Sequence, residues 1–482
     1  MNDATLEEQL QRGSLSNIGA AIRAKEISIR ETVGWYLARI DALNSAGPML
    51  NAVRAVSSKA GEDAKRLDEE LQAGHDRGPL HGIPVLLKDN IMTADGLSAT
   101  GGAAALCDFV PRREATLVRL LRDAGAIVLG KTNMTEFADY VSDVMPSEFS
   151  GAGGVVRNPH GQRYGRGQGS SVGSAAAVAA GFAPIAIGSE TQNSIQTPCC
   201  HSSVVGFKPS VGTVSRTGMI PLVPSQDSPG PIARSLQDAA LVFAAIEGAD
   251  SRDTATFAAS VGERAASPVS IAGVRIGVPR CAIASRPDYS GVLAAFEDVL
   301  SRLSRAGAII VDACDLPSAE QLQEVRSSVF PTEFKAALDA FLEEHGAPCG
   351  IVSLADLVRW NEKHPEFIPY GQSLLVAARG TNGLRDVRYR SDRARDLALS
   401  RTAGIDAALE QSGANVLIAP MGAAAKCTGK AGAPVVALPA GLDAAGAPFG
   451  VTLFTSFRND MRLLKVAEAV EHVVGERRLP AL

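Results

Sequence analysis

The spacing of apolar residues changes near residue 81. Before that point apolar positions recur at helical spacing, most clearly in residues 29–43, where Val33, Tyr36 and Ile40 would share one helix face and Ser28 is placed to cap the helix. Residues 58–74 carry a second amphipathic pattern of Ala, Leu and charged residues. We therefore predict a helical N-terminal arm over residues 1–75 that packs over the main sheet.

From residue 81 onward, short apolar runs alternate with longer amphipathic stretches. The first of these runs, within residues 81–91, breaks at Lys88 and Asp89, which suggests a buried strand with a charged end. The alternation predicts an α/β fold with a large mixed, mostly parallel sheet sandwiched between helices. Further strands are expected at residues 126–130, 184–188, 274–278, 308–311, 415–420, 434–439 and 448–454, and helices at residues 114–125, 174–180, 235–248, 289–306 and 460–474.

Residues 318–401 differ from this alternation because they are helical in pattern and more charged, with Pro365 and Pro369 as helix breaks. Acidic residues interleave with the arginines of residues 379–401, which favours a solvated helix face over a nucleic-acid patch. No internal repeat or low-complexity linker divides the chain. We expect one domain over residues 1–482, with residues 318–401 covering the substrate.

Composition narrows the classes of function. The 482 residues are 46% hydrophobic and 21% charged, and the net charge of −5 gives no basic footprint for nucleic acid. The most apolar run, residues 175–188, is too short and too rich in Gly and Pro to span a bilayer, and residues 1–30 lack the apolar core of a signal peptide. We expect a cytoplasmic protein without membrane or nucleic-acid partners, and we leave a homodimer open.

Cysteine and histidine spacing argues against disulfides and metals. The seven cysteines are scattered without a C-x-x-C pair, which favours reduced thiols. The seven histidines show neither H-x-H nor H-E-x-x-H spacing. We expect neither a metal site nor a cofactor.

The stretch from residue 165 to residue 209 is the most unusual in the chain. Gly and Ser open it, small apolar residues follow, and hydroxyls return at Ser189, Thr191 and Ser194. The pattern predicts loop, helix, strand and loop, with Gly181 ending the helix. A phosphate-binding loop would require a Lys-Ser/Thr pair or a preceding strand, and the stretch has neither. The attached Ala-rich helix disfavours a flexible linker. The remaining interpretation is that backbone N–H groups and hydroxyls converge on a reacting carbonyl.

Four runs of this chain form a recognisable set: GSSVGSAAAVAAG from Gly169, GSETQNSI from Gly188, VVGFKP from Val204 and QDSPGPIAR from Gln226. These runs resemble the amidase signature family, and the likeness extends over about residues 37–471. The resemblance implies that family's α/β/α fold and the hydrolysis of an amide through an acyl-enzyme on serine.

The resemblance also assigns roles to individual residues. Lys88, in the run GIPVLLKD from Gly82, matches the family's lysine base, Ser170 its bridging serine and Ser194 its nucleophile. A lysine accepts a proton at neutral pH only if burial lowers its pKa from about 10.4, and the apolar run before Lys88 would supply that burial. The oxyanion hole is expected from the backbone N–H groups of Thr191, Gln192, Asn193 and Ser194.

Neighbouring residues offer rival interpretations. His201 lies seven positions after Ser194 and invites a Ser-His-Asp triad, but we favour a structural histidine. Cys199 and Cys200 are interpreted as packing residues rather than as nucleophiles. We expect Asp89 and Asp227 to hold the loops in place.

The chain departs from the family pattern beside the nucleophile. Gln192-Asn193 replaces the usual Gly-Gly, and Gln168 and Val172 replace other glycines. The oxyanion hole uses backbone atoms and survives such changes, whereas the side chains of Gln192 and Asn193 are expected to narrow the pocket.

Three functions remain open at this point. Two segments, beginning at Glu333 and Tyr370, look most like bacterial peptide amidases, which release ammonia from C-terminal peptide amides; other small amides remain candidates. The first alternative is the A subunit of a tRNA-dependent glutamyl/aspartyl amidotransferase, which needs partner subunits. The second is a non-catalytic scaffold of the same fold, suggested only by Gln192-Asn193.

Overall fold

A computed structural model of the chain describes residues 3–258, 270–312, 314–475 and 477–482. An eleven-stranded sheet runs through it, in the order β1-β3-β2-β6-β8-β7-β12-β13-β11-β9-β10. Its strands are β1 (Val53–Val56), β2 (Pro84–Lys88), β3 (Ile127–Thr132), β6 (Ile185–Glu190), β7 (Val205–Lys208), β8 (Ser228–Ala233), β9 (Arg275–Gly277), β10 (Ile309–Val311), β11 (Val416–Pro420), β12 (Val435–Leu442) and β13 (Pro448–Phe454), while β4 (Phe149–Ser150) and β5 (Gly154–Val155) form a separate hairpin.

Helices cover both faces of the sheet, as predicted, because the strands in its middle are mostly apolar and every residue of β2, β3, β6 and β8 is buried. The helices of the first 300 residues are α1 (Asp3–Arg12), α2 (Leu15–Arg23), α3 (Ile29–Ile40), α4 (Ala60–Gln72), α5 (Thr116–Asp123), α6 (Val172–Ala180), α7 (Gln196–Ser202), α8 (Leu236–Ile246), α9 (Arg280–Ala284) and α10 (Leu293–Arg305). Those of the remainder are α11 (Ala319–Glu324), α12 (Val329–His345), α13 (Leu354–Lys363), α14 (Ser373–Arg379), α15 (Val387–Leu397), α16 (Ala407–Ser412), α17 (Ala425–Ala431) and α18 (Asp460–Val474).

The sheet is mixed, as expected, with parallel pairs toward its two ends and the antiparallel pair β1-β3 at one edge. Neighbours run parallel in β3-β2-β6 and in β11-β9-β10. The pairs between β6 and β11 are antiparallel. The parallel pairing of β2 with both β3 and β6 brings the carboxyl ends of these strands to one edge, and Lys88 and Glu190 stand there as the last residues of β2 and β6.

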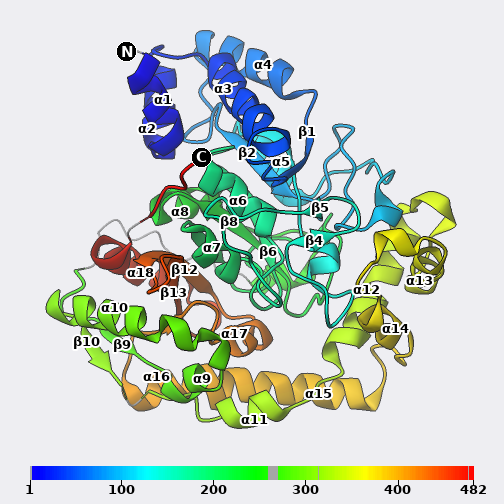
Figure 1. Cartoon of the computed structure of the whole chain (residues 1–482), viewed down its shortest axis with the longest axis vertical. Coiled ribbons are helices and arrows are strands. Elements are labelled where there is room, and N and C mark those ends of the chain that lie inside the picture. Colours follow the sequence, from blue (N-terminus) through cyan, green and yellow to red (C-terminus); the bar gives the residue numbers. More distant parts are fainter. Residues whose placement is uncertain (1–2, 259–269, 313, 476) are drawn as a thin grey trace.

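The N-terminal arm is helical, and its helices begin where the sequence indicates. Ser28 caps α3 in a reciprocal capping box with Glu31. In Figure 1 the blue helices α1 to α4 lie together at one end of the molecule, beside β1 and β2. The sequence analysis did not predict β1, which interrupts this helical arm and pairs antiparallel with β3.

Residues 318–401 form helices α11 to α15, which lie along the side and base of the molecule in Figure 1. Together with loops from residues 92–145 and 220–223, part of this region forms a second hydrophobic cluster apart from the main core. Phe334 of α12 stacks edge-to-face on Phe137, with ring centroids 5.7 Å apart. The region thus packs directly on the loop that follows β3.

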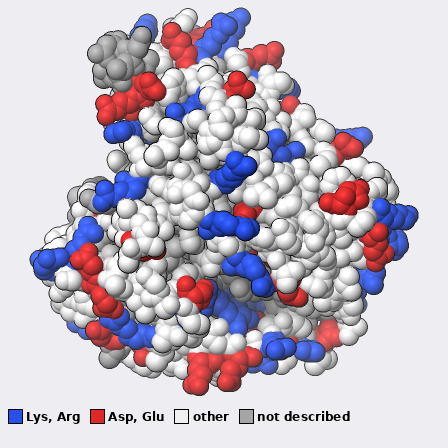
Figure 2. Space-filling view, viewed as in Figure 1, with Lys and Arg blue, Asp and Glu red and all other residues white. Residues whose placement is uncertain are grey.

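Figure 2 shows Lys and Arg side chains gathered along a central hollow on one face, between α17 and the helices α12 and α14. Within the described residues, no helix combines the length and the apolar composition needed to cross a bilayer.

Candidate active site

The predicted lysine and bridging serine meet at the end of β2. Lys88 is fully buried, and its Nζ lies 2.7 Å from Ser170 Oγ, 3.0 Å from Ser189 O and 3.0 Å from Ser189 Oγ. Nζ can donate to all three oxygens; when the amine is neutral, one of these positions becomes a lone pair, which can accept the Ser170 hydroxyl proton.

Burial decides the charge of Lys88. Removal from water lowers the pKa of Lys88 to about 7, and the nearby carboxyl groups of Asp227, Glu190 and Asp139 oppose that shift. The sequence analysis expected the apolar residues before Lys88 to bury its amine and lower its pKa. With a pKa of about 7, about half of the Lys88 side chains are free base near neutral pH.

Ser170 lies in the loop before α6, and Ser194 in the loop between β6 and α7. The two loops are tied together, because the backbone N–H of Ser171 donates to the carbonyl oxygen of Ser194 at 3.0 Å. Ser170 and Ser194 are both buried. The helix α6 ends at Gly181, which adopts φ +75° as predicted.

The buried carboxylate of Glu190 holds the Ser194 loop. It accepts the backbone N–H of Ile195 at 2.7 Å, that of Gln196 at 2.9 Å and the Gln196 side-chain amide at 2.7 Å. These bonds satisfy donors at the start of α7 immediately after Ser194. The sequence analysis did not single out Glu190; an acidic residue shortly before a helix start was the available signal.

The backbone N–H groups expected to form the oxyanion hole are available. Within the part of the chain that the structure describes, the N–H groups of Thr191, Gln192, Asn193 and Ser194 donate no hydrogen bond. Thr191 and Ser194 are buried, and buried N–H groups are seldom left unpaired in native proteins, so this loop offers a place for an acceptor.

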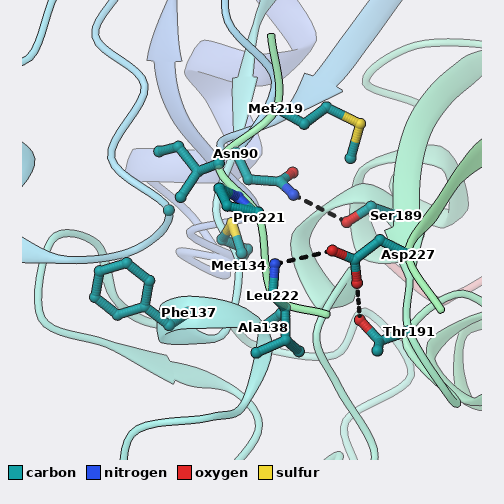
Figure 3. Close-up of a pocket in the computed structure, with 12 residues that line it drawn as sticks. Asn90, Met134, Phe137, Ala138, Ser189, Thr191, Met219, Pro221, Leu222 and Asp227 are labelled. Carbon is teal, nitrogen blue, oxygen red and sulfur yellow. Dashed lines mark hydrogen bonds between the residues drawn. The ribbon is translucent and has the colours of Figure 1, made fainter. Parts of the chain in front are cut away.

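Gln192 and Asn193 turn their side chains toward other loops. The Gln192 amide is 3.4 Å from Gln226 Oε1, and Asn193 Nδ2 donates to the carbonyl oxygen of Gly167. Neither residue lines the pocket of Figure 3. The expected narrowing of that pocket by these two side chains is therefore absent from the described geometry of the site.

Figure 3 shows the pocket beside this cluster. Asn90 donates to Ser189 Oγ at 3.0 Å, and Asp227 accepts the Thr191 hydroxyl at 2.6 Å and the backbone N–H of Leu222 at 2.9 Å. Asp227 thus joins the Ser194 loop to the opposite wall. The remaining lining is mostly apolar: Met134, Phe137, Ala138, Met219, Ile220, Pro221 and Leu222, with Gly101.

The wall that carries Phe137 has an unusual backbone. Phe137, Ala138 and Asp139 all have positive φ, at 42°, 55° and 75°. Such residues cost free energy and cluster at functional sites. Asp139 is partly buried and accepts the Ser147 hydroxyl at 2.7 Å, and its removal from water raises the pKa of Asp139 to about 6. No glycine marks this segment, so no residue pattern indicated its backbone conformation.

The other residues that the sequence analysis considered for a catalytic role lie in surroundings typical of packing or structural residues. Burial lowers the pKa of His201 to about 4, so its ring is neutral at pH 7, and it packs edge-to-face on Tyr164. Cys199 and Cys200 are buried free thiols whose pKa burial raises. Asp89 binds Arg54 through two hydrogen bonds of 2.7 Å. Among the described residues, no group of three or more His, Cys, Asp or Glu could hold a metal ion.

Comparison with known proteins agrees with this picture. A family model described as Amidase matches residues 31–464. A probable amidase of Arabidopsis thaliana is 32% identical over 98% of this chain and 92% of its own. The A subunit of a glutamyl-tRNA(Gln) amidotransferase from Ralstonia pickettii is 31% identical over 97% of this chain and 99% of its own.

The structure of the native peptide amidase from Stenotrophomonas maltophilia superposes with a TM-score of 0.88 and 38% identity, covering 97% of this chain and 98% of that one. The sequence match and the structural match both extend over nearly the whole chain. The protein therefore belongs to the amidase signature family and is an amide-hydrolysing enzyme.

Proposed function

We propose that this amidase cleaves carboxamides through an acyl-enzyme on Ser194, with Lys88 as the base and Ser170 as the bridge between them. The observation that carries the proposal is the fully buried Lys88 with its Nζ 2.7 Å from Ser170 Oγ. Neutral Lys88 takes the Ser170 hydroxyl proton, Ser170 takes that of Ser194, and Ser194 Oγ attacks the carbonyl carbon.

The free N–H groups of residues 191–194 then stabilise the negative oxygen that develops on the carbonyl. The reversed relay delivers the proton to the leaving nitrogen, and ammonia or an amine departs. Water enters, gives its proton to the same relay and cleaves the ester on Ser194, which releases the acid. No metal or cofactor takes part in any of these steps.

We propose C-terminal amides of peptides, together with small amides that bear an apolar acyl group, as the substrates. Two observations support this choice: the similarity to the S. maltophilia peptide amidase and the apolar lining of the pocket in Figure 3. We further propose that helices α11 to α15 cover the substrate, since Phe334 of α12 packs on Phe137 of that pocket.

The similarity to the amidotransferase A subunit favours a second candidate, in which this chain releases ammonia for a partner enzyme. Purified protein alone, assayed for ammonia from N-acylated dipeptide amides, simple aliphatic amides and glutamine, separates the two. We expect turnover of the apolar peptide amides without any added subunit or tRNA.

The matched control is Ser194→Ala, which should retain less than about one per cent of the rate, because losing the nucleophile removes a step worth several powers of ten. The amidotransferase would be favoured if glutamine were the only amide that releases ammonia and if this release required added partner subunits.

A further inference from the structure

Another pocket, of about 640 Å³, shares no lining residue with the pocket of Figure 3. We call it the arginine pocket, because Arg216, Arg393, Arg401 and Arg458 line it. It lies between α12, the start of α15 and Phe457. Ala336, Ala337 and Ala340 of α12 form an apolar wall.

Two of these arginines have no carboxylate partner. Arg401 donates its Nε to the carbonyl oxygen of Ala431 at 2.5 Å, and its guanidinium lies 3.6 Å from the centre of the Phe457 ring. Arg393 reaches only the carbonyl oxygen of Ser225, at 3.4 Å, and its Nη1 is buried without a hydrogen-bond partner. Within the described residues, neither forms an ion pair.

The acidic residues of the pocket are already engaged. Glu333 accepts the backbone N–H of Ser225 at 2.9 Å and the Tyr389 hydroxyl at 3.0 Å. Arg216 is engaged as well, because its Nε–H donates a hydrogen bond of 2.8 Å to the carboxylate of Asp253. Among the described residues, therefore, no carboxylate binds the guanidinium of Arg393 or Arg401 directly.

Like charges in a partly dry pocket repel one another. Burial, followed by the field of Arg393 and a smaller one from Arg458, lowers the pKa of Arg401 to about 10, while the carboxyl group of Asp406 opposes that shift. An anion between these side chains would relieve the repulsion and accept the unpaired N–H groups. The planar guanidinium fork matches a carboxylate in particular.

We propose that the arginine pocket is a binding site for an organic carboxylate with an apolar body. The carboxylate lies between Arg393 and Arg401, and the apolar body lies against Phe457 and the alanines of α12. The pocket volume is that of a small-molecule site, and its wall of alanine and aromatic side chains favours such a ligand over inorganic phosphate.

Isothermal titration calorimetry with 3-phenylpropionate as the probe tests the proposal on the intact protein. We expect saturable one-site binding, with 3-phenylpropan-1-ol and inorganic phosphate at least about tenfold weaker, because the first lacks the charge and the second lacks the apolar body. Phosphate binding as tight as that of the probe would overturn the assignment to an apolar carboxylate.

Substitutions locate the binding. Arg393→Gln and Arg401→Gln should each weaken it by at least about tenfold, since each removes a charge-assisted contact. Ala336→Phe should also abolish it, by filling the pocket without removing a charge. Arg390→Gln is the matched control, because Arg390 is exposed on the same helix and lies outside the pocket.

Circular dichroism and the melting temperature establish that each variant is folded before its titration is interpreted. The proposal fails if the wild-type protein shows no saturable binding. It also fails if the folded Ala336→Phe and Arg393→Gln variants bind as well as Arg390→Gln, because the probe would then occupy another place, such as the reaction site.

Discussion

Lys88 connects the burial of one residue to the activity of the enzyme. The amine is drawn out of water by the apolar strand that carries it, and its pKa falls to about 7. Desolvation of a charge is costly, so the same burial that prepares the base lowers the stability of its protonated form. The surrounding carboxyl groups of Asp227, Glu190 and Asp139 moderate that cost without forming an ion pair with it.

The first prediction concerns the pH dependence of the rate. Lys88 accepts a proton only as the free amine, so kcat/KM should rise about tenfold per pH unit below pH 7 and level off above it. Initial rates on one peptide amide between roughly pH 5 and 9 measure the profile. Asp139→Asn should move the midpoint to lower pH, because it removes a negative charge that favours protonated Lys88. A flat profile would contradict the lysine base.

Glu190 is a positioning residue, and its replacement tests that role. In Glu190→Gln one of the acceptor oxygens becomes an amide that faces the donors from Ile195 and Gln196. We expect kcat to fall at least about tenfold with a smaller change in KM, because the Ser194 loop is misplaced rather than the pocket. The unfolding free energy should fall by about 1–3 kcal/mol for a buried donor left unpaired. Unchanged kcat and melting temperature would remove Glu190 from the account.

At the scale of elements, the site is assembled where a strand end, a helix start and a distant helix meet. Gly429 of α17 lies so close to the Ser194 loop that an added Cβ would come within 2.6 Å of Gln192 Cγ and 2.7 Å of Thr191 O. The close approach explains a glycine in the middle of a helix, where glycine is otherwise unfavourable.

Gly429→Ala should therefore push the loop away from its place and lower kcat several-fold or more. Gly34→Ala is the control, since Gly34 lies exposed in α3 with nothing within 4 Å of its Cβ position. That change should leave the rate unchanged and stabilise the protein by about 0.5–1 kcal/mol. Kinetics and thermal unfolding of both variants compare them directly, and equal effects on kcat would contradict the close packing.

The helices and strands that could be predicted from the sequence are those in which apolar residues recur at a regular spacing. The strand Pro448–Phe454 and the helix Asp460–Val474 lie at the predicted residues, and the ends of α3, α5 and α6 differ by a few positions only. The strands β7 and β8 and the helix α7 were missed. Ser228–Ala233 contains two prolines and a glycine, and Pro198 interrupts α7, so local propensity indicated turns where tertiary pairing imposes regular structure.

The candidate site follows the same division. Lys88, Ser170 and Ser194 were found by their resemblance to a family, and the first two lie in contact as that resemblance implies. Gly429 acts through a contact between segments far apart in the chain, and Asp139 stands in a run of positive backbone φ angles, so no short-range sequence pattern marks either of them. Glu190 binds N–H groups five and six residues later, so its place shortly before a helix start was a short-range signal.

For the whole molecule, the desolvation cost of the buried Lys88 makes the free energy of unfolding depend on pH. The pKa of Lys88 is about 7 in the folded protein and that of an ordinary lysine, 10.5, when the chain unfolds. Between these two values the unfolded chain binds more protons, so this residue makes the folded state more stable as the pH rises and less stable as it falls toward 7. Below pH 7 both states are protonated and the penalty is complete.

Lys88→Met removes this dependence. The melting temperature of Lys88→Met relative to the wild type should therefore be highest near pH 7 and decline as the pH rises toward 10. Differential scanning calorimetry of both proteins across that range measures the difference. Lys131→Met is the comparison, because Lys131 is another buried lysine, with its Nζ on the carbonyl oxygen of Ile91, and its loss shows what removal of such an amine does. A difference that is constant with pH would mean that Lys88 is not held as the free base.

The most direct test of the account is the identity of the serine that forms the covalent bond. We predict that a fluorophosphonate probe labels the intact protein once and that peptide mapping by mass spectrometry places the adduct on Ser194. Ser194→Ala should take up no label, and Lys88→Ala should be labelled at least about a hundredfold more slowly, because the hydroxyl loses its base. An adduct on Ser170, Ser171 or Ser189, or on a cysteine, with Ser194 unmodified, would contradict the central claim.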